Sequence, residues 1–93
     1  MIKIKKGYKL CAVGADHVVI APSHEYVNLA RVVTLNESAA ALWHAVEGEA
    51  FDVDRLTELL TATYNVGIEQ ARADAKAFIS TLLDEHIAET TFA

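Results

Sequence analysis

The sequence predicts an α+β domain in which a three-stranded antiparallel sheet is followed by a bundle of three helices. Three observations favour this fold class. Short strand-like runs lie within the first 35 residues, a strand-to-helix junction lies at residues 34–43, and the apolar positions beyond it follow helical spacing. Strands grouped before helices are typical of α+β domains, and 93 residues with an apolar content of 53% suffice for one small domain with its own core.

The first two strands are expected to form a β-hairpin. Residues 8–13 alternate enough for a half-buried strand, residues 14–16 are a tight turn, and residues 17–21 are a β-branched run that Pro22 ends. A third strand is expected at residues 31–35, directly before the first helix.

The junction at residues 34–43 contains two candidate helix caps. Thr34 and Glu37 match the S/T-x-x-E capping box, in which each side chain can satisfy a backbone N–H of the other's turn, and Asn36 is a competing cap. The first helix is expected at about residues 36–46. Its buried face is expected to hold Ala39, Leu42, Trp43 and Val46.

Two further helices complete the predicted bundle. Asp52 is expected to cap the second helix, and residues 65–67 separate it from a third at about residues 68–85, as in a helix-turn-helix. The deepest stripe of the third helix is Ala71, Ala75, Phe78 and Leu82. A second stripe beside it is Ile68, Arg72, Lys76, Ile79 and Leu83. Residues 86–88 either add a strand or cover the core.

Charge is divided unevenly along the chain, whose net charge is −5. Residues 1–31 carry five Lys or Arg against two Asp or Glu, a net charge of +3. Residues 32–93 carry three Lys or Arg against eleven Asp or Glu, a net charge of −8. This division reflects either the solvated faces of different elements or two faces made for different partners.

Motifs that carry catalytic or metal chemistry are missing from the sequence. It has no glycine-rich phosphate loop and no Ser/His/Asp elbow, and no two of its four histidines have the spacing of a helical metal site. We therefore expect no catalytic residue, no metal, no cofactor and no enzyme activity. Cys11, the single cysteine, lies among apolar residues, and we expect it to be a buried structural thiol.

The sequence also lacks the signals of membrane insertion and export. No apolar run approaches the ~20 residues of a membrane span, and the basic start is not followed by the apolar segment of a signal peptide. A cytoplasmic location with no membrane partner is the default expectation. The hairpin edge and the basic N-terminus leave a homodimer as open as a monomer.

The junction and the helices after it resemble the PqqD-like family, named for the pyrroloquinoline quinone biosynthesis protein D. The most specific part of the resemblance is Leu35-Asn36-Glu37-Ser38-Ala39 followed by Leu42-Trp43. The resemblance covers about residues 8–88, so residues 1–93 are expected to form a single domain of this family. The chain departs from the family pattern at His86, where members often have glycine, and in a longer stretch at residues 26–30.

The resemblance implies a winged-helix-like peptide chaperone that does no chemistry itself. Such a domain recognises the leader of a ribosomally synthesised precursor peptide and presents it to a modifying enzyme, often a radical SAM enzyme. The leader adds as a strand to the sheet edge, in a groove between the third strand and the last helix. Carried over by position, the groove residues are Val32, Val33, Thr34, Leu35, Arg72, Lys76, Ile79 and Leu83. Arg72 and Lys76 could then receive acidic side chains of the leader.

Other interpretations fit the same residues. Apolar strand and helix positions often belong to a core, and Arg72 or Lys76 can pair with an acid such as Glu69 on a helix surface. A winged-helix DNA-binding protein is one alternative function, but Glu69 and Asp74 on the candidate recognition helix oppose phosphate contact, so we expect no nucleic acid partner. A structural subunit of an enzyme complex is the other alternative.

Overall fold

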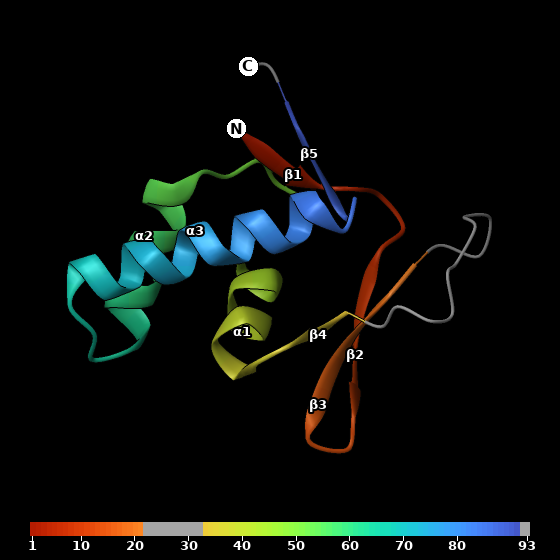
Figure 1. Cartoon of the computed structure of the whole chain (residues 1–93), viewed down its shortest axis with the longest axis horizontal. Helices are drawn as coiled ribbons and strands as arrows, with labels where there is room; N and C mark the ends of the chain where they lie inside the picture. The colour runs from red at the N-terminus through yellow and green to blue at the C-terminus, as the bar shows by residue number, and fades with distance from the viewer. Residues whose placement is uncertain (22–32, 92–93) are drawn as a thin grey trace.

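The computed structural model describes residues 1–21 and 33–91 of the chain. Its elements are, in order, β1 (Ile2–Ile4), β2 (Lys9–Val13), β3 (Asp16–Ile20), β4 (Thr34–Leu35), α1 (Glu37–Val46), α2 (Val53–Thr63), α3 (Ile68–Asp84) and β5 (Ala88–Thr90). The predicted fold class is confirmed, because the antiparallel sheet β2-β3-β4 is followed by three helices (Figure 1). Within the described ranges, no helix has both the length and the apolar character to cross a membrane.

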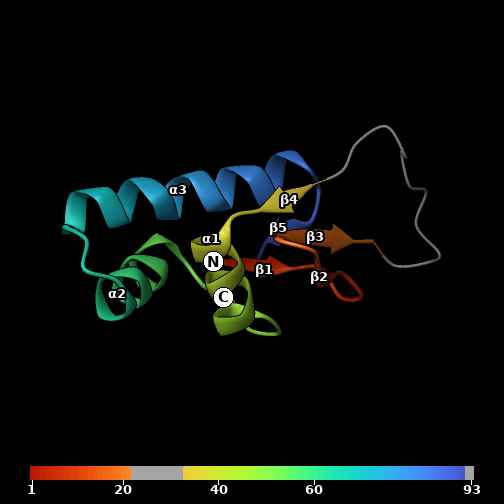
Figure 2. The same cartoon turned by 90° about the horizontal axis from the view of Figure 1, so that it is seen from below.

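The predicted hairpin is confirmed as β2–β3, but its turn has two residues, 14 and 15, rather than three, because Asp16 already belongs to β3. Gly14 has φ +62°, a left-handed angle that this kind of turn requires and that glycine adopts without strain. β4 continues the sheet, with Thr34 opposite Val18 and Leu35 opposite His17. The strand order leaves β4 at an edge, and Figures 1 and 2 place that edge beside the C-terminal half of α3.

The first two helices each begin at a side-chain cap. Oδ1 of Asn36 and Oδ1 of Asp52 each accept a hydrogen bond from the backbone N–H three residues later, at 2.8 and 2.9 Å. Asp52 is therefore the cap that the sequence predicts, whereas the proposed capping box of Thr34 and Glu37 is wrong. Thr34 still belongs to β4, and Glu37 is the first helical residue rather than the third, so neither side chain has the position that the box needs.

The core lies between the helices and the inner face of the sheet. All four residues of the deepest α3 stripe are buried, as predicted. Trp43 is fully buried together with Val46, Phe51 and Leu56. Ala39 was expected on the same buried face as Trp43 but is only half-buried, because it borders the cavity described below.

A separate two-stranded sheet, β1–β5, joins the two ends of the described chain. Ile2 also bridges to Phe51, and the N–H of Thr91 donates to the carbonyl of Met1 at 2.9 Å. The sequence left open whether residues 86–88 add a strand, and it gave no reason to expect one at the basic start. Each of these strands is three residues long, too short for alternation to reveal it.

α3 ends in a Schellman motif that directs the chain into β5. The N–H of Ile87 donates to the carbonyl of Leu82 at 2.8 Å, and the N–H of His86 donates to Leu83 at 3.1 Å. Ile87 and Leu82 are both buried in the core, which completes the motif. His86 has φ +59°, so a side chain occupies a position that normally favours glycine.

Cys11 is exposed, so the expectation of a buried thiol is wrong. Successive side chains of a strand face opposite sides of the sheet. Leu10 packs against the core, which leaves Cys11 on the other side, in register with Val18. Alternation along β2 was visible in the sequence, but the set of side chains that meets the helices was not.

Candidate functional site

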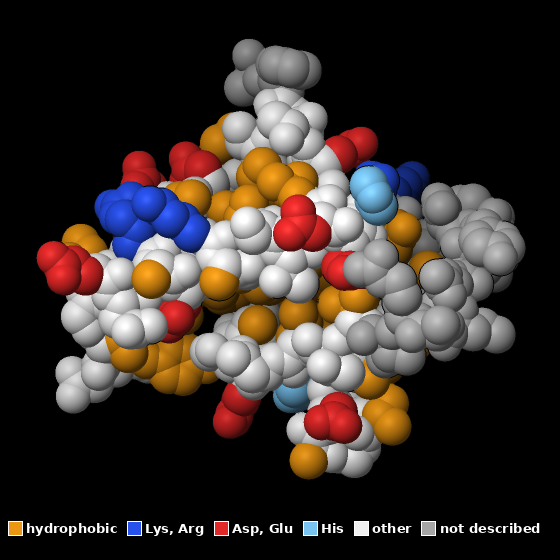
Figure 3. Space-filling view, in the orientation of Figure 1, with side chains coloured by type: hydrophobic (Ala, Val, Ile, Leu, Met, Phe, Trp, Pro, Cys, Tyr) orange, Lys and Arg blue, Asp and Glu red, His pale blue; other side chains and the backbone are white. Residues whose placement is uncertain are grey.

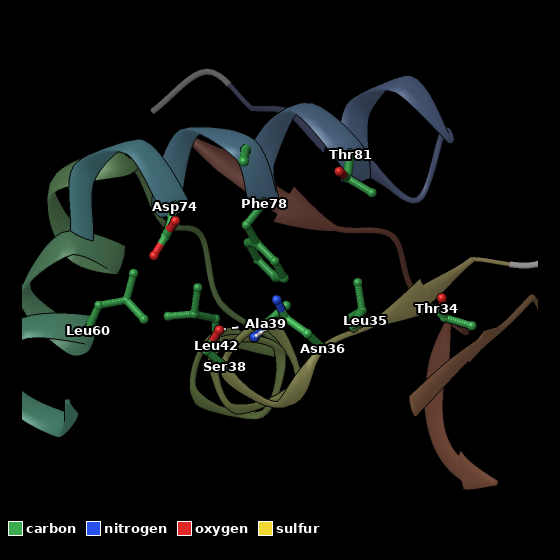
Figure 4. Close-up of a pocket in the computed structure, with 11 residues that line it drawn as sticks. Thr34, Leu35, Asn36, Ser38, Ala39, Leu42, Leu60, Asp74, Phe78 and Thr81 are labelled. Carbon is green, nitrogen blue, oxygen red and sulfur yellow. Dashed lines mark hydrogen bonds between the residues drawn. The ribbon is translucent and has the colours of Figure 1, made fainter. Parts of the chain in front are cut away.

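A cavity of about 240 Å³ lies between α3 and the junction of β4 with α1 (Figure 4). We call this cavity the groove. Among the residues that the structure describes, eleven line it: Thr34, Leu35, Asn36, Ser38, Ala39, Leu42, Leu60, Asp74, Ala77, Phe78 and Thr81. Four elements therefore meet at the groove, and β4 and α3 provide its two facing walls.

The groove has an apolar base. Leu35, Leu42, Leu60 and Phe78 are all buried, and Figure 4 shows Phe78 pointing from α3 toward α1. Near them lie the small side chains of Ala39 and Ala77 and the polar side chains of Thr34, Asn36, Ser38, Asp74 and Thr81. The groove can therefore hold apolar side chains of a ligand at its base, while its own polar groups contact the ligand's backbone or polar side chains.

The groove side of β4 offers unpaired backbone groups. Hydrogen-bonded and non-hydrogen-bonded pairs alternate along an antiparallel ladder. The N–H of Val19 donates to the carbonyl of Val33 at 3.0 Å, so the next pair, Val18 with Thr34, is a non-hydrogen-bonded one. The N–H and C=O of Thr34 therefore point away from β3, toward the open edge of the sheet, and Thr34 lines the groove.

The strand residues predicted for the site are only partly found at the groove. Thr34 and Leu35 line it. Val33 is half-buried against the core on the β3 side, and Val32 lies outside the described residues. The structure thus brings the end of β4 to the groove, directly before the Asn36 cap.

The helix residues predicted for the site do not line the groove. Arg72 and Lys76 are exposed, and Ile79 and Leu83 pack partly buried against the core. At about 3.6 residues per turn, these four residues lie on one flank of the buried α3 stripe. The groove lies on the other flank, which presents Asp74, Ala77, Phe78 and Thr81.

The flank of α3 that lines the groove combines a small residue with polar ones. Ala77 is small, which leaves room between α3 and β4, and Asp74 and Thr81 are polar residues on the same side of the helix. Figure 3 shows hydrophobic side chains exposed along a hollow below α3, whereas the Lys and Arg side chains visible in that view lie above it. The stripe that contains Arg72 and Lys76 was assigned to the groove by position in the family pattern, whereas the packing of α3 puts the opposite flank there.

Arg72 has a different partner. Its Nη1 lies 2.9 Å from Oδ1 of Asp54 in the first turn of α2. Both side chains are largely exposed, at 44% and 73%, so the pair contributes little to stability. The sequence suggested a surface ion pair as one role for Arg72, and the structure supplies Asp54 as the acid instead of Glu69.

A second cavity of about 470 Å³ lies on the β1–β5 side of the molecule. Lys3, Lys5 and Lys6 line it together with Glu47 and Glu89, so its charges are mixed. It contains no residue of β4 and no edge of the three-stranded sheet. The groove is therefore the better candidate for binding an extended chain.

Comparison with known proteins agrees with the resemblance noted in the sequence. The solved structure "TbiB1 in Complex with the TbiA(beta) Leader Peptide" superposes with a TM-score of 0.70 over 98% of this chain and 99% of that chain, at 14% sequence identity. This likeness shows a shared fold. A search of curated protein sequences finds no significant match. The family model described as Coenzyme PQQ synthesis protein D (PqqD) matches residues 16–88. Because that match covers well over half of the chain, the protein belongs to the PqqD family.

Proposed function

We propose that this domain binds the leader of a ribosomally synthesised precursor peptide in the groove, by adding the leader as a strand to β4. One observation carries the proposal: the outward N–H and C=O of Thr34 lie beside a cavity with an apolar base. A peptide residue opposite Thr34 makes two backbone hydrogen bonds, and an adjacent side chain enters the space near Leu42 and Phe78. Membership of the PqqD family supports this role, and the similar TbiB1 structure is itself a leader-peptide complex.

The size of the groove fits a short extended segment. Its volume of about 240 Å³ is below the ~300–1,000 Å³ of typical small-molecule sites. Backbone pairing supplies affinity that does not depend on side chains, and the groove adds selection for a few of them. In place of the sequence-derived helix residues, we propose Asp74, Ala77, Phe78 and Thr81 as the helix contacts, with Thr34 and Leu35 as the strand contacts.

Chemical modification of the bound peptide belongs, in this proposal, to a separate enzyme such as a radical SAM enzyme. The polar residues that line the groove are two threonines, one serine, one asparagine and one aspartate. Ser38 Oγ donates to Asn36 Oδ1 at 3.1 Å rather than to a base, so this hydroxyl is not arranged as an activated nucleophile. The domain holds and presents the leader, and the modified part of the peptide extends beyond the groove.

A titration tests the binding mode. We expect the leader of the precursor peptide encoded beside this protein's gene to shift the backbone amide signals of residues 33–39 and 74–81 in labelled protein. Shifts confined to the lysine-rich residues 3–9, or no shifts at micromolar peptide, would overturn the groove proposal.

The Thr34→Pro variant tests strand addition directly. Proline removes the N–H of Thr34, which points to the open edge, and leaves the bonds of Val33 and Leu35 with β3 in place. Binding should therefore weaken while the fold persists, and the Thr34→Val control, which keeps the N–H, should bind normally. Full binding by folded Thr34→Pro protein would contradict strand addition at this position.

A further inference from the structure

Asp74 is the only charged residue among the eleven described residues that line the groove. Figure 4 shows its carboxylate pointing from α3 into the cavity, near Leu60, at the end of the groove away from Thr34. The remaining polar lining residues are uncharged. The electrostatic preference of the groove therefore depends on a single negative side chain.

The carboxylate of Asp74 is held in place and retains hydrogen-bonding capacity. Its Oδ1 accepts a hydrogen bond from Nε2 of Gln70, one turn earlier, at 2.8 Å. No Lys or Arg of the described ranges forms an ion pair with Asp74. Arg72 and Lys76 lie on the opposite flank of α3, and Arg72 is engaged by Asp54. A carboxylate can accept about four hydrogen bonds, so Asp74 can still receive a cationic donor.

The direction of β4 determines which end of a bound peptide meets Asp74. β4 runs from Thr34 toward Asn36 and α1, that is, toward the Asp74 end of the groove (Figure 4). A peptide that continues the antiparallel order of the sheet runs the opposite way. One residue of the peptide pairs with Thr34, and the peptide residues on the N-terminal side of that residue therefore approach Asp74.

We propose that Asp74 selects peptides that carry Lys or Arg on the N-terminal side of the residue paired with Thr34. This inference rests on the proposed function, because it assigns a preference within the same groove. It reverses the sign of the sequence expectation, in which Arg72 and Lys76 receive acidic side chains. A cation at this position gains a charge-assisted hydrogen bond, whereas an Asp or Glu meets a like charge.

A selection experiment identifies the preference without a known ligand. The probe is a displayed library of random 12-residue peptides, selected separately on the wild-type domain and on the Asp74→Asn and Asp74→Lys variants. The Ala77→Trp variant, in which an indole occupies the groove, provides the background. Asp74 and Ala77 are both exposed, so the variants should fold, and circular dichroism checks this.

The wild-type domain should enrich Lys or Arg at a fixed distance on the N-terminal side of an apolar residue. The Asp74→Asn variant should keep the apolar residue and lose the basic one, and the Asp74→Lys variant should enrich Asp or Glu there. Equal enrichment on the wild type and Asp74→Asn, or acidic residues on the wild type, would overturn the inference and leave the proposed function intact. If every peptide selected on the wild type also binds the Ala77→Trp variant, the groove is not the binding site. That result would overturn the proposed function, and the inference with it.

A double-mutant cycle then measures the contact. For a selected peptide, its Lys→Gln change should weaken binding to the wild type by about two- to fivefold, the range of a partly exposed ion pair. The same change should have no effect on the Asp74→Asn variant, and the difference should shrink as salt rises. An equal loss on both proteins would contradict the contact with Asp74.

Discussion

Arg72 Nη1 lies 2.9 Å from Asp54 Oδ1, and this contact joins the exposed flank of α3 to the first turn of α2. The most conspicuous cation of the last helix is therefore engaged outside the groove. Arg72→Ala should leave leader binding unchanged and alter the free energy of unfolding by less than about 1 kcal/mol, because the pair is exposed. Calorimetric titration and urea denaturation measure the two effects, with Asp54→Ala as the matched control. A large loss of binding in Arg72→Ala would show that the leader contacts the flank of α3 that carries Arg72, and not the groove.

Filling the groove should weaken binding strongly without unfolding the domain. Ala77 lines the groove and Ala73 does not, although both are exposed residues of α3. Ala77→Trp should weaken leader binding by about tenfold or more, since the indole competes with the peptide for the cavity. Ala73→Trp adds the same side chain on solvent-facing helix surface and should bind normally. Equal binding by both variants in fluorescence-polarisation titrations would show that the groove is not used.

The two helix caps separate stability from binding. Asn36→Ala and Asp52→Ala each remove one side-chain bond to a helix N-terminus, so each should cost about 1 kcal/mol of unfolding free energy. Asn36 lines the groove and Asp52 does not. We expect Asn36→Ala to weaken leader binding more than Asp52→Ala does at a similar loss of stability. Denaturation followed by the fluorescence of Trp43, the single tryptophan, gives the stabilities, and equal binding losses would mean that the cap acts only through stability.

His86→Gly should stabilise the domain. The left-handed φ of +59° costs a residue with a side chain roughly 1 kcal/mol, whereas glycine adopts this angle without strain. Part of that gain is offset because glycine has a greater conformational entropy in the unfolded chain. We expect a gain of about 0.5–1 kcal/mol in thermal or urea unfolding. His86→Ala keeps the Cβ and should show no such gain. A His86→Gly protein no more stable than the wild type would mean that the histidine side chain makes a compensating contribution.

Much of the scaffold was predictable because it depends on local chemistry. The hairpin turn at Gly14, the cap at Asp52 and the four-residue buried stripe of α3 each follow from residues that are close in the sequence. Competing local signals were harder to rank. Thr34 and Asn36 were both plausible caps, and the extent of β4 decides between them, since Thr34 remains in the strand.

The helix wall of the groove was not predictable in the same way. Helical spacing identifies the buried stripe, but both flanks of that stripe have the same periodicity. The side that faces β4 depends on how α3 lies against a strand about forty residues earlier, which no local pattern encodes. The family resemblance implies a site between the third strand and the last helix, and β4 and α3 provide facing walls of the groove. The predicted helix residues, Arg72, Lys76, Ile79 and Leu83, were carried over by position from that resemblance as one stripe of the helix. The positions of Ala77 and Phe78 required the packed structure.

The pairing of β1 with β5 brings Met1 and Thr91 within one backbone hydrogen bond of each other. Figure 1 shows β1 and β5 on the side of α3 opposite β4 and α1, which border the groove. The described fold is therefore nearly a closed loop. A short Gly/Ser connection between the ends, with new termini opened at the Gly14 turn, should give a circular permutant in which β4, α1 and α3 keep their arrangement. A fluorophore or surface tether attached at either end would likewise stand away from the peptide, so immobilised or labelled protein should report groove binding without steric interference.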